Sequence, residues 1–268
     1  MPLKIALVGR AIRYSPNSED KDAAILEAVR KRLSEKAVEV VTIPENEFHA
    51  LDSVDACLMM GRSEAALQLV ERLQVPVVNT PAAIRLCNQR ERLMLLLEAN
   101  GITVPPLRGD EGYWVKRGDG CAECAAAVRY AADWAEAVRM REAMKLRGIY
   151  SVDVRAHETG DLVKFYAVRN TDFFRYYYPG DDGDWKFHDE QHQEKPRHHA
   201  FDEGKLQAMA DAAARLAGVE IYGGDCIIRP DGQPVLIDLN DWPSFSRCRE
   251  EAADAIVQRF WAMMNEER

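Results

Sequence analysis

The sequence has no long apolar segment of the kind that crosses a membrane. No uninterrupted apolar run in its 268 residues approaches the length of about 18 that spans a bilayer. The opening residues, MPLKIALVGRA, turn polar too early for the core of a secretion signal. We therefore expect a cytoplasmic protein with no membrane partner.

The sequence also lacks a net positive charge and the several closely spaced cysteine pairs of a disulfide framework. The formal net charge of −9 gives no overall field that would attract a nucleic-acid backbone, so we expect no nucleic-acid partner. Of the six cysteines, only Cys121 and Cys124 form a CxxC pair. A single pair inside a glycine-rich turn indicates reduced thiols, and redox or metal chemistry at this pair is the alternative.

The first part of the chain, residues 1–88, alternates between strand-like and helix-like segments. The strand-like runs are KIALVG, VEVVTI, DACLMMG and VPVVN, and the helix-like ones include AAILEAVRKRL and SEAALQLVERL. This alternation predicts a Rossmann-like parallel α/β domain, in which ligands collect at the carboxyl ends of the strands. Arginines at or near those ends are candidate contacts for an anionic substrate, with ordinary surface charge as the alternative: Arg10, Arg13 and Arg62.

After residue 88 the pattern changes. A helix-like stretch, QRERLMLLLEAN, ends at Gly101, and the prolines at 105 and 106 mark a lobe boundary. The run YWVKRGDG predicts a strand that enters a glycine-rich turn, and the alanine-rich residues 123–144 predict mostly helix. We expect this first lobe, called lobe A, to cover about residues 89–150.

Residues from about 151 to 268 are expected to form a second lobe, called lobe B, built mostly from antiparallel strands. Its strand-like runs are YSVDVRAH, LVKFYAVR, DFFRYYY, EIYGGDCIIR and PVLIDLND, and KLQAMADAAARLA predicts a helix against them. Thr159 with Gly160, and Asp231 with Gly232, are turn dipeptides that predict two hairpins. Residues 180–202 are too polar to bury, and we expect a mobile or substrate-covering loop there.

This polar loop allows two further interpretations. His188 and His192 in HDEQH are spaced as in a zinc-protease motif, but Asp189 stands where that motif has glutamate, so we do not favour zinc hydrolysis. The basic residues near the end of the loop are either contacts for an anionic substrate or a solvated charge run. They are Lys195, Arg197, His198 and His199.

Three oxygen-bearing side chains are expected to meet on the last two strands. In VLIDLNDWPSF, Asp238 and Asn240 are two residues apart on a strand and therefore share a face. The second predicted hairpin lays the strand that carries Asp225 antiparallel to this one. Because Mg²⁺ prefers carboxylate and amide oxygens, this trio is a candidate magnesium site, and a simple polar turn before Pro243 is the alternative.

Two lysines lie on otherwise apolar strands. Lys116 shares a face with Trp114, and the glycines that follow it let the backbone close over phosphates. Lys164 shares a face with Leu162 and Tyr166. Both lysines predict contacts with an anion such as a nucleotide phosphate, and the alternative is that each side chain simply reaches solvent.

Together these motifs resemble the ATP-grasp superfamily. The likeness rests on a lysine before a glycine-rich loop, on the strand KFYAV, and above all on GGDCIIRPDGQPVLIDLNDWPSF. Residues 1–88 resemble the α/β domain that precedes the ATP-grasp core, and residues 89–268 resemble the two-lobed α+β ATP-grasp domain. The likeness is to carboxylate–amine ligases, RimK-like proteins among them, with some resemblance to the inositol-phosphate kinase branch.

The resemblance implies roles for individual residues in binding Mg-ATP. Lys116 and Lys164 would contact phosphates, and Glu158 or Asp161 would hold the ribose. The adenine would be bound by the backbone at Arg155, Ala156 and His157. The magnesium ligands would be Asp225, Asp238 and Asn240. The candidate catalytic residues are Lys164 and Arg247. Two departures stand out: Arg90, also a candidate nucleotide contact, replaces a lysine that many members carry, and Arg155 replaces a frequent glutamine or glutamate.

The resemblance implies an ATP-dependent ligase that joins a small carboxylate to an amine through an acylphosphate, with release of ADP and phosphate. A small-molecule kinase of the same fold, acting on a sugar or an inositol phosphate, is the alternative, and a nucleotide-binding protein without activity is a third. The cofactors would be ATP and Mg²⁺, and the partner a small-molecule acceptor. If the chain assembles, we expect a homodimer, the commonest assembly of soluble proteins.

Overall fold

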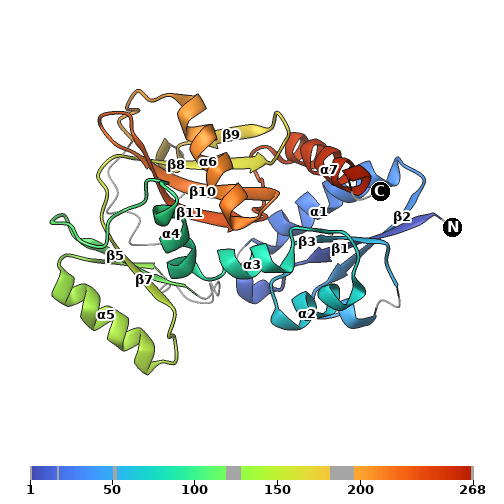
Figure 1. Ribbon diagram of the computed structural model, residues 1–268, viewed down its shortest axis with the longest axis horizontal. Helices are drawn as coiled ribbons and strands as arrows, with labels where there is room; N and C mark the ends of the chain where they lie inside the picture. The colour runs from blue at the N-terminus through green and yellow to red at the C-terminus, as the bar shows by residue number, and fades with distance from the viewer. Residues whose placement is uncertain (1, 17, 51–52, 119–127, 182–195, 267–268) are drawn as a thin grey trace.

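Three β-sheets, each with its own helices, make up the computed structural model in the residues that it describes, which are 2–16, 18–50, 53–118, 128–181 and 196–266. The sheets follow one another along the long axis of the molecule, and the two ends of the chain lie at the same end of it (Figure 1). The helices include three short 3-10 turns, η1 (Ile12–Tyr14), η2 (Phe48–Ala50) and η4 (Pro179–Asp181). No helix in the described ranges is long and apolar enough to span a bilayer.

The first sheet is parallel and confirms the predicted α/β domain. Its strands are β1 (Leu3–Gly9), β2 (Val38–Pro44), β3 (Ala56–Met59) and β4 (Val77–Val78), in the order β2-β1-β3-β4. Alternate residues of a strand point to opposite faces. One face therefore packs against α1 (Glu19–Ser34) and the other against α2 (Glu64–Leu73). Because the strands are parallel, their carboxyl ends lie at one edge of the sheet.

The second sheet has the antiparallel order β6-β5-β7 and is covered on one face by α5 (Trp134–Leu146). Its strands are β5 (Tyr113–Arg117), β6 (Val128–Ala131) and β7 (Val152–Ala156). The prediction of mostly helix over residues 123–144 is therefore wrong at β6, where Val128 and Tyr130 favour strand and the segment pairs with β5. The helix begins only after Asp133, whose carboxylate caps it by accepting a hydrogen bond from the Glu136 backbone N–H at 2.7 Å.

The third sheet is antiparallel, in the order β11-β10-β8-β9. Its strands are β8 (Asp161–Val168), β9 (Phe174–Tyr177), β10 (Ile221–Ile228) and β11 (Pro234–Asp241). One face packs against α4 (Arg90–Ala99) and α6 (Glu203–Ala217), so the other face carries the polar side chains of these strands. The hairpin predicted at Asp231 and Gly232 is confirmed, because β10 and β11 pair directly on either side of it.

The hairpin predicted at Thr159 and Gly160 is wrong. Strand β7 pairs with β5 in the second sheet, whereas β8 pairs with β9 and β10 in the third, so residues 157–160 link two sheets. Gly160 has a φ of +153°, and a Cβ there would collide with the Ile228 carbonyl oxygen. The chain therefore passes from the second sheet to the third between β7 and β8.

Two helices tie the first domain to the rest of the chain. Helix α3 (Pro81–Cys87) contacts β11 and α6, and Thr80 caps it by accepting a hydrogen bond from the Ala83 backbone N–H. The last helix, α7 (Arg249–Glu266), was not identified from the sequence, and it packs along α1 in a core that also holds Trp242 and Phe245 (Figure 1). The first domain and the third sheet therefore share one hydrophobic core.

Candidate functional site

A row of charged side chains crosses the face of the third sheet opposite α4 and α6. In the strand register, Lys164 of β8 lies opposite both Tyr177 of β9 and Asp225 of β10, and Asp225 lies opposite Asp238 of β11. Directly paired residues of an antiparallel sheet project to the same face, so these four side chains stand side by side. We call them the charged row. Asn240 follows on the same face, opposite Gly223.

Each carboxylate of the charged row is paired with a cation. The Lys164 Nζ lies 3.0 and 3.1 Å from the two oxygens of Asp225, and the Arg90 Nη1 lies 2.8 Å from Oδ1 of Asp238. Burial by itself raises the pKa of Asp238, but the charges of Arg90 and Lys116 outweigh it and hold the pKa below its ordinary value. Asp238 is therefore an anion that needs a cation beside it.

Lys116 reaches this row from the second sheet. Its Nζ donates to the Ile237 carbonyl oxygen at 3.3 Å, so the side chain bridges β5 and β11. Burial lowers the pKa of Lys116 and the charge of Arg90 lowers it further, against the opposing attraction of Asp238 and Asp225. The structure thus brings together Arg90, Lys116, Lys164, Asp225, Asp238 and Asn240, which the sequence analysis selected as candidate phosphate and magnesium residues.

Arg247 also joins this group. Its guanidinium carbon lies 4.1 Å from the ring centre of Tyr177, at the β9 end of the charged row. The Tyr177 hydroxyl is 2.6 Å from that of Tyr166, which shares the face of Lys164. A guanidinium and two linked phenols therefore border the row on the side away from Arg90.

In the candidate adenine segment, the Arg155 side chain and two backbone N–H groups have partners within the protein. The Arg155 guanidinium turns toward α4, where it bonds to Glu98 at 3.1 Å and to the Pro105 carbonyl at 3.0 Å. The backbone N–H of Ala156 donates to the Pro106 carbonyl and that of His157 to the Gly112 carbonyl, each at 2.8 Å. The Arg155 side chain and these two N–H groups are thus engaged within the protein and hold the end of β7 in place.

Of the two candidate ribose ligands, Asp161 has a structural role. Its carboxylate, with 2% of the residue exposed, accepts hydrogen bonds at 2.6 Å from the backbone N–H groups of Arg197 and His199. Glu158 forms a two-point pair with Arg229, at 2.8 Å for both contacts. A ribose would have to share Glu158 with Arg229, and Asp161 instead fixes the chain that follows residue 196.

Trp114, His157 and Tyr130 form an aromatic group whose contacts were not predicted, although Trp114 and His157 were each singled out in the sequence. The Trp114 Nε1 donates to the His157 Nδ1 at 3.0 Å, and the ring of Tyr130 packs edge-on against both. Trp114 shares its strand face with Lys116. Because Lys116 bonds to the Ile237 carbonyl, this face is turned toward the apolar cluster of the third sheet around Ile237. The tryptophan was visible in the sequence, but its partners lie on β6 and beyond β7, too distant in the chain to be recognised.

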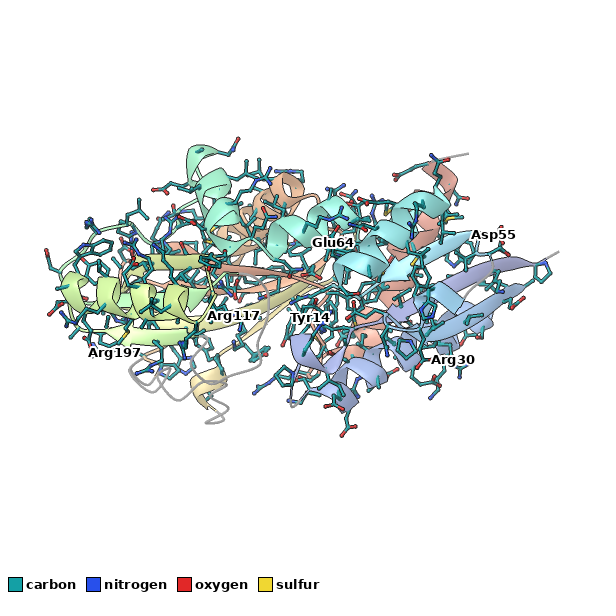
Figure 2. All side chains as sticks on the ribbon, turned by 90° about the horizontal axis from the view of Figure 1, so that it is seen from below. Tyr14, Arg30, Asp55, Glu64, Arg117 and Arg197 are labelled. Atoms are coloured by element: carbon teal, nitrogen blue, oxygen red, sulfur yellow. The ribbon has the colours of Figure 1, made fainter. Side chains whose placement is uncertain are left out.

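The candidate substrate arginines have protein partners. Arg10 forms a two-point ion pair with Asp22, at 2.9 Å for both contacts, and the Arg13 guanidinium lies 4.7 Å from the ring centre of Tyr14. Arg62 pairs with Asp241 at 2.8 Å. Tyr14 and Arg62 line a cavity of about 310 Å³ between the first domain and the second sheet. Figure 2 shows Tyr14 and Glu64 on the side of the first domain that faces Arg117 at the end of β5.

Several predicted features lie outside the described residues. These are the second glycine of the glycine-rich loop, the CxxC pair, the two histidines of HDEQH and Lys195. His198 is described, and its ring packs on Tyr178 and pairs with Asp181 at 3.1 Å. Within the described ranges, no group of three or more His, Cys, Asp or Glu side chains is placed to hold a metal ion, so the candidate magnesium site depends on the Asn240 amide as its third oxygen.

Comparison with known proteins identifies the fold. No protein-family model matches the chain, and no curated protein sequence matches it. Among solved structures, D-alanine–D-alanine ligase from Bacillus anthracis complexed with ATP has a TM-score of 0.68 and 12% identity over 100% of both chains. The VanG D-Ala:D-Ser ligase from Enterococcus faecalis has a TM-score of 0.69 and 13% identity, covering 97% of this chain and 100% of its own.

A third similar structure carries the name of the fold. The RimK domain ATP-grasp protein from Sphaerobacter thermophilus has a TM-score of 0.61 and 18% identity, covering 96% of this chain and 99% of its own. The likeness extends over nearly the whole length of both chains in all three comparisons. The chain therefore has the ATP-grasp fold, as the sequence motifs predicted.

Proposed function

We propose that this protein is an ATP-dependent ligase that joins a small carboxylate to an amine and releases ADP and phosphate. The observation that carries the proposal is the charged row, in which Lys164, Asp225 and Asp238 stand side by side, with Arg90 and Lys116 reaching it from other elements. Two similar structures are named as ligases, and one of them was solved with ATP. Fold similarity alone does not define an activity, so the proposal depends mainly on the residues of the charged row.

The residues of the row, together with Asn240, fit magnesium and a nucleoside triphosphate. Asp225, Asp238 and Asn240 offer carboxylate and amide oxygens, the ligands that Mg²⁺ prefers. When bound, Mg²⁺ supplies positive charge to the phosphate oxygens. Arg90 and Lys164, which pair with these carboxylates, would likewise supply positive charge to the phosphates. A phosphate chain between the two sheets would give both cations new anionic partners. We assign phosphate contacts to Arg90, Lys116 and Lys164, and the ribose to Glu158.

In the proposed reaction, the fixed cations of the chain stabilise the phosphoryl group during its transfer. An oxygen of the acceptor carboxylate forms a bond to the γ-phosphorus as the bond to the ADP oxygen breaks, which gives an acylphosphate. The amine nitrogen then bonds to the acyl carbon, loses a proton and displaces phosphate. We assign to Lys164, beside Asp225, and to Arg247, beside Tyr177, the neutralisation of negative charge on the transferred group and on the acceptor.

The setting of this reaction follows from its substrates. Both the acceptor and the amine are small molecules, and a supply of ATP places the enzyme in the cytoplasm. We also propose Arg10 and Arg13 as substrate contacts, and a substrate would have to share the Arg10 guanidinium with Asp22. A homodimer stays a prediction from the sequence analysis.

Phosphorus NMR of the protein with Mg-ATP and a pool of small carboxylates and amines tests the proposal. A ligase produces ADP and inorganic phosphate in equal amounts, and only when the pool is present. ADP together with a new phosphoester signal, without matching phosphate, identifies a kinase instead. If wild-type protein binds Mg-ATP but releases no ADP with any part of the pool, the ligase assignment fails.

A further inference from the structure

The side chain of Arg62 crosses from the first domain to the end of β11. Its Nη2 lies 2.8 Å from Oδ1 of Asp241 and donates to the Asp241 carbonyl oxygen at 3.1 Å, while Nε donates to Oδ2 at 3.2 Å. Only 9% of the Arg62 side chain and 1% of the Asp241 side chain are exposed. One guanidinium thus fixes both the carboxylate and the backbone of the residue that ends the strand.

The backbone of Arg62 is fixed as firmly as its side chain. The Glu45 carboxylate, which follows β2, accepts hydrogen bonds from the backbone N–H groups of Arg62 at 2.8 Å and of Ser63 at the start of α2. Its other oxygen accepts from the backbone N–H of Ala11, after β1. Glu45 therefore ties the loops after β1 and β3 together, and Arg62 projects from a rigid base toward β11.

Asp241 is the neighbour of Asn240 and lies three residues after Asp238 on the same strand. We propose that Arg62 is a positioning residue for the nucleotide site, which sets the end of β11 so that Asp238 and Asn240 present their oxygens together; this inference rests on the proposed Mg-ATP function. The first domain then takes part in building the nucleotide site without touching the nucleotide.

The energetics support a role for this pair in fixing the strand. Burial by itself lowers the pKa of Arg62, but the attraction of Asp241 outweighs it and the pKa is raised. Loss of Arg62 leaves the Asp241 carboxylate, with 1% of its side chain exposed, without the cation that pairs with it among the described residues. An uncompensated charge in such a place is relieved by moving toward water, and that movement displaces the end of β11.

The test compares Arg62→Met and Arg62→Lys with a control in another buried ion pair. The control is Arg259→Met, because the Arg259–Glu220 pair is also buried, with 5% and 8% exposed and a distance of 2.7 Å, but ties α7 to the start of β10; Glu220 keeps Arg169 as a second cation. The probe is the magnesium complex of a non-hydrolysable ATP analogue, with binding measured by calorimetry. Residues that orient metal ligands typically change affinity by about 10- to 100-fold. We expect a loss of that size in Arg62→Met, a smaller one in Arg62→Lys, and wild-type affinity in Arg259→Met.

A double variant separates positioning from stability. Arg62→Met combined with Asp241→Asn removes both buried charges, so it should regain thermal stability but not nucleotide affinity. Equal affinity losses in Arg62→Met and Arg259→Met, or full recovery of affinity in the double variant, would overturn the positioning role. Failure of the wild-type protein to bind the magnesium complex at all would instead refute the proposed function, so the two failures are distinct.

Discussion

Replacing Asp238 with asparagine probes the charged row most directly. The Arg90–Asp238 distance of 2.8 Å corresponds to an attraction of about 6 kcal/mol at an effective dielectric constant of about 20. Desolvation offsets much of this, and buried pairs that lose one partner are destabilised by roughly 3–5 kcal/mol. Because 16% of the Asp238 side chain and 19% of the Arg90 side chain are exposed, and asparagine keeps an acceptor oxygen, we expect a loss of about 2 kcal/mol.

A loss of this size leaves the protein folded. For a chain of 268 residues it lowers the melting temperature by about 4 °C, which differential scanning calorimetry resolves. The effect on activity should be far larger, about 10²- to 10³-fold in the rate of ADP release, because one of the preorganised charges around the phosphates is lost. The two readouts therefore separate a damaged site from a damaged fold.

The control for this variant is Asp211→Asn. Asp211 accepts a hydrogen bond from the Tyr222 hydroxyl on the helix-covered face of the same sheet. It should lose stability without losing the rate of ADP release. Wild-type turnover together with wild-type affinity for the magnesium nucleotide in Asp238→Asn would refute the assignment of the charged row.

Three further variants test other parts of the structure. Because the folded protein lowers the pKa of Lys116 below its ordinary value of 10.5, the unfolded chain binds more protons in the alkaline range below that value, so stability to urea should rise with pH there. Lys116→Met should remove that part of the pH dependence, which urea titrations at several pH values measure. Lys164→Met should cost about 10²-fold or more in ADP release at saturating ATP, measured with a coupled assay, and an unchanged rate excludes Lys164 from the reaction. In Gly224→Ala, the added methyl group collides with the Asp238 carbonyl oxygen and the Phe165 ring, so calorimetry should show a loss of about 1–3 kcal/mol, and an unaltered melting temperature contradicts the packing.

Local sequence rules were sufficient for much of the charged row. Asp238 and Asn240 share a face because side chains alternate along a strand, and a tight turn at Asp231 and Gly232 fixes how β10 pairs with β11. One irregularity was not foreseen: the pairing shifts between Asp225 and Cys226, which places Asp225 directly opposite Asp238. A bulge of this kind depends on both strands and on what packs against them.

The errors occurred where neighbouring segments decide the structure. The alanines on either side favour helix, but Val128 and Tyr130 favour strand, and residues 128–131 pair with the edge of β5 as β6. Thr159 and Gly160 have the composition of a hairpin turn, yet β7 finds its partner in β5. Propensity and turn composition describe a segment by itself, and they carry no information about which strand lies beside it.

The sequence by itself determined the order of elements in the first domain, the face on which the polar side chains of β11 lie, and the motifs that resemble ATP-grasp proteins, because each depends on spacings of a few residues. Only the tertiary structure decided the partners of the charges. Arg62 looked like a ligand contact from its place after a strand, and its actual partner, Asp241, is 179 residues away. A charged side chain pairs with the opposite charge that the fold brings within a few ångströms. That distance is fixed by packing rather than by position in the chain.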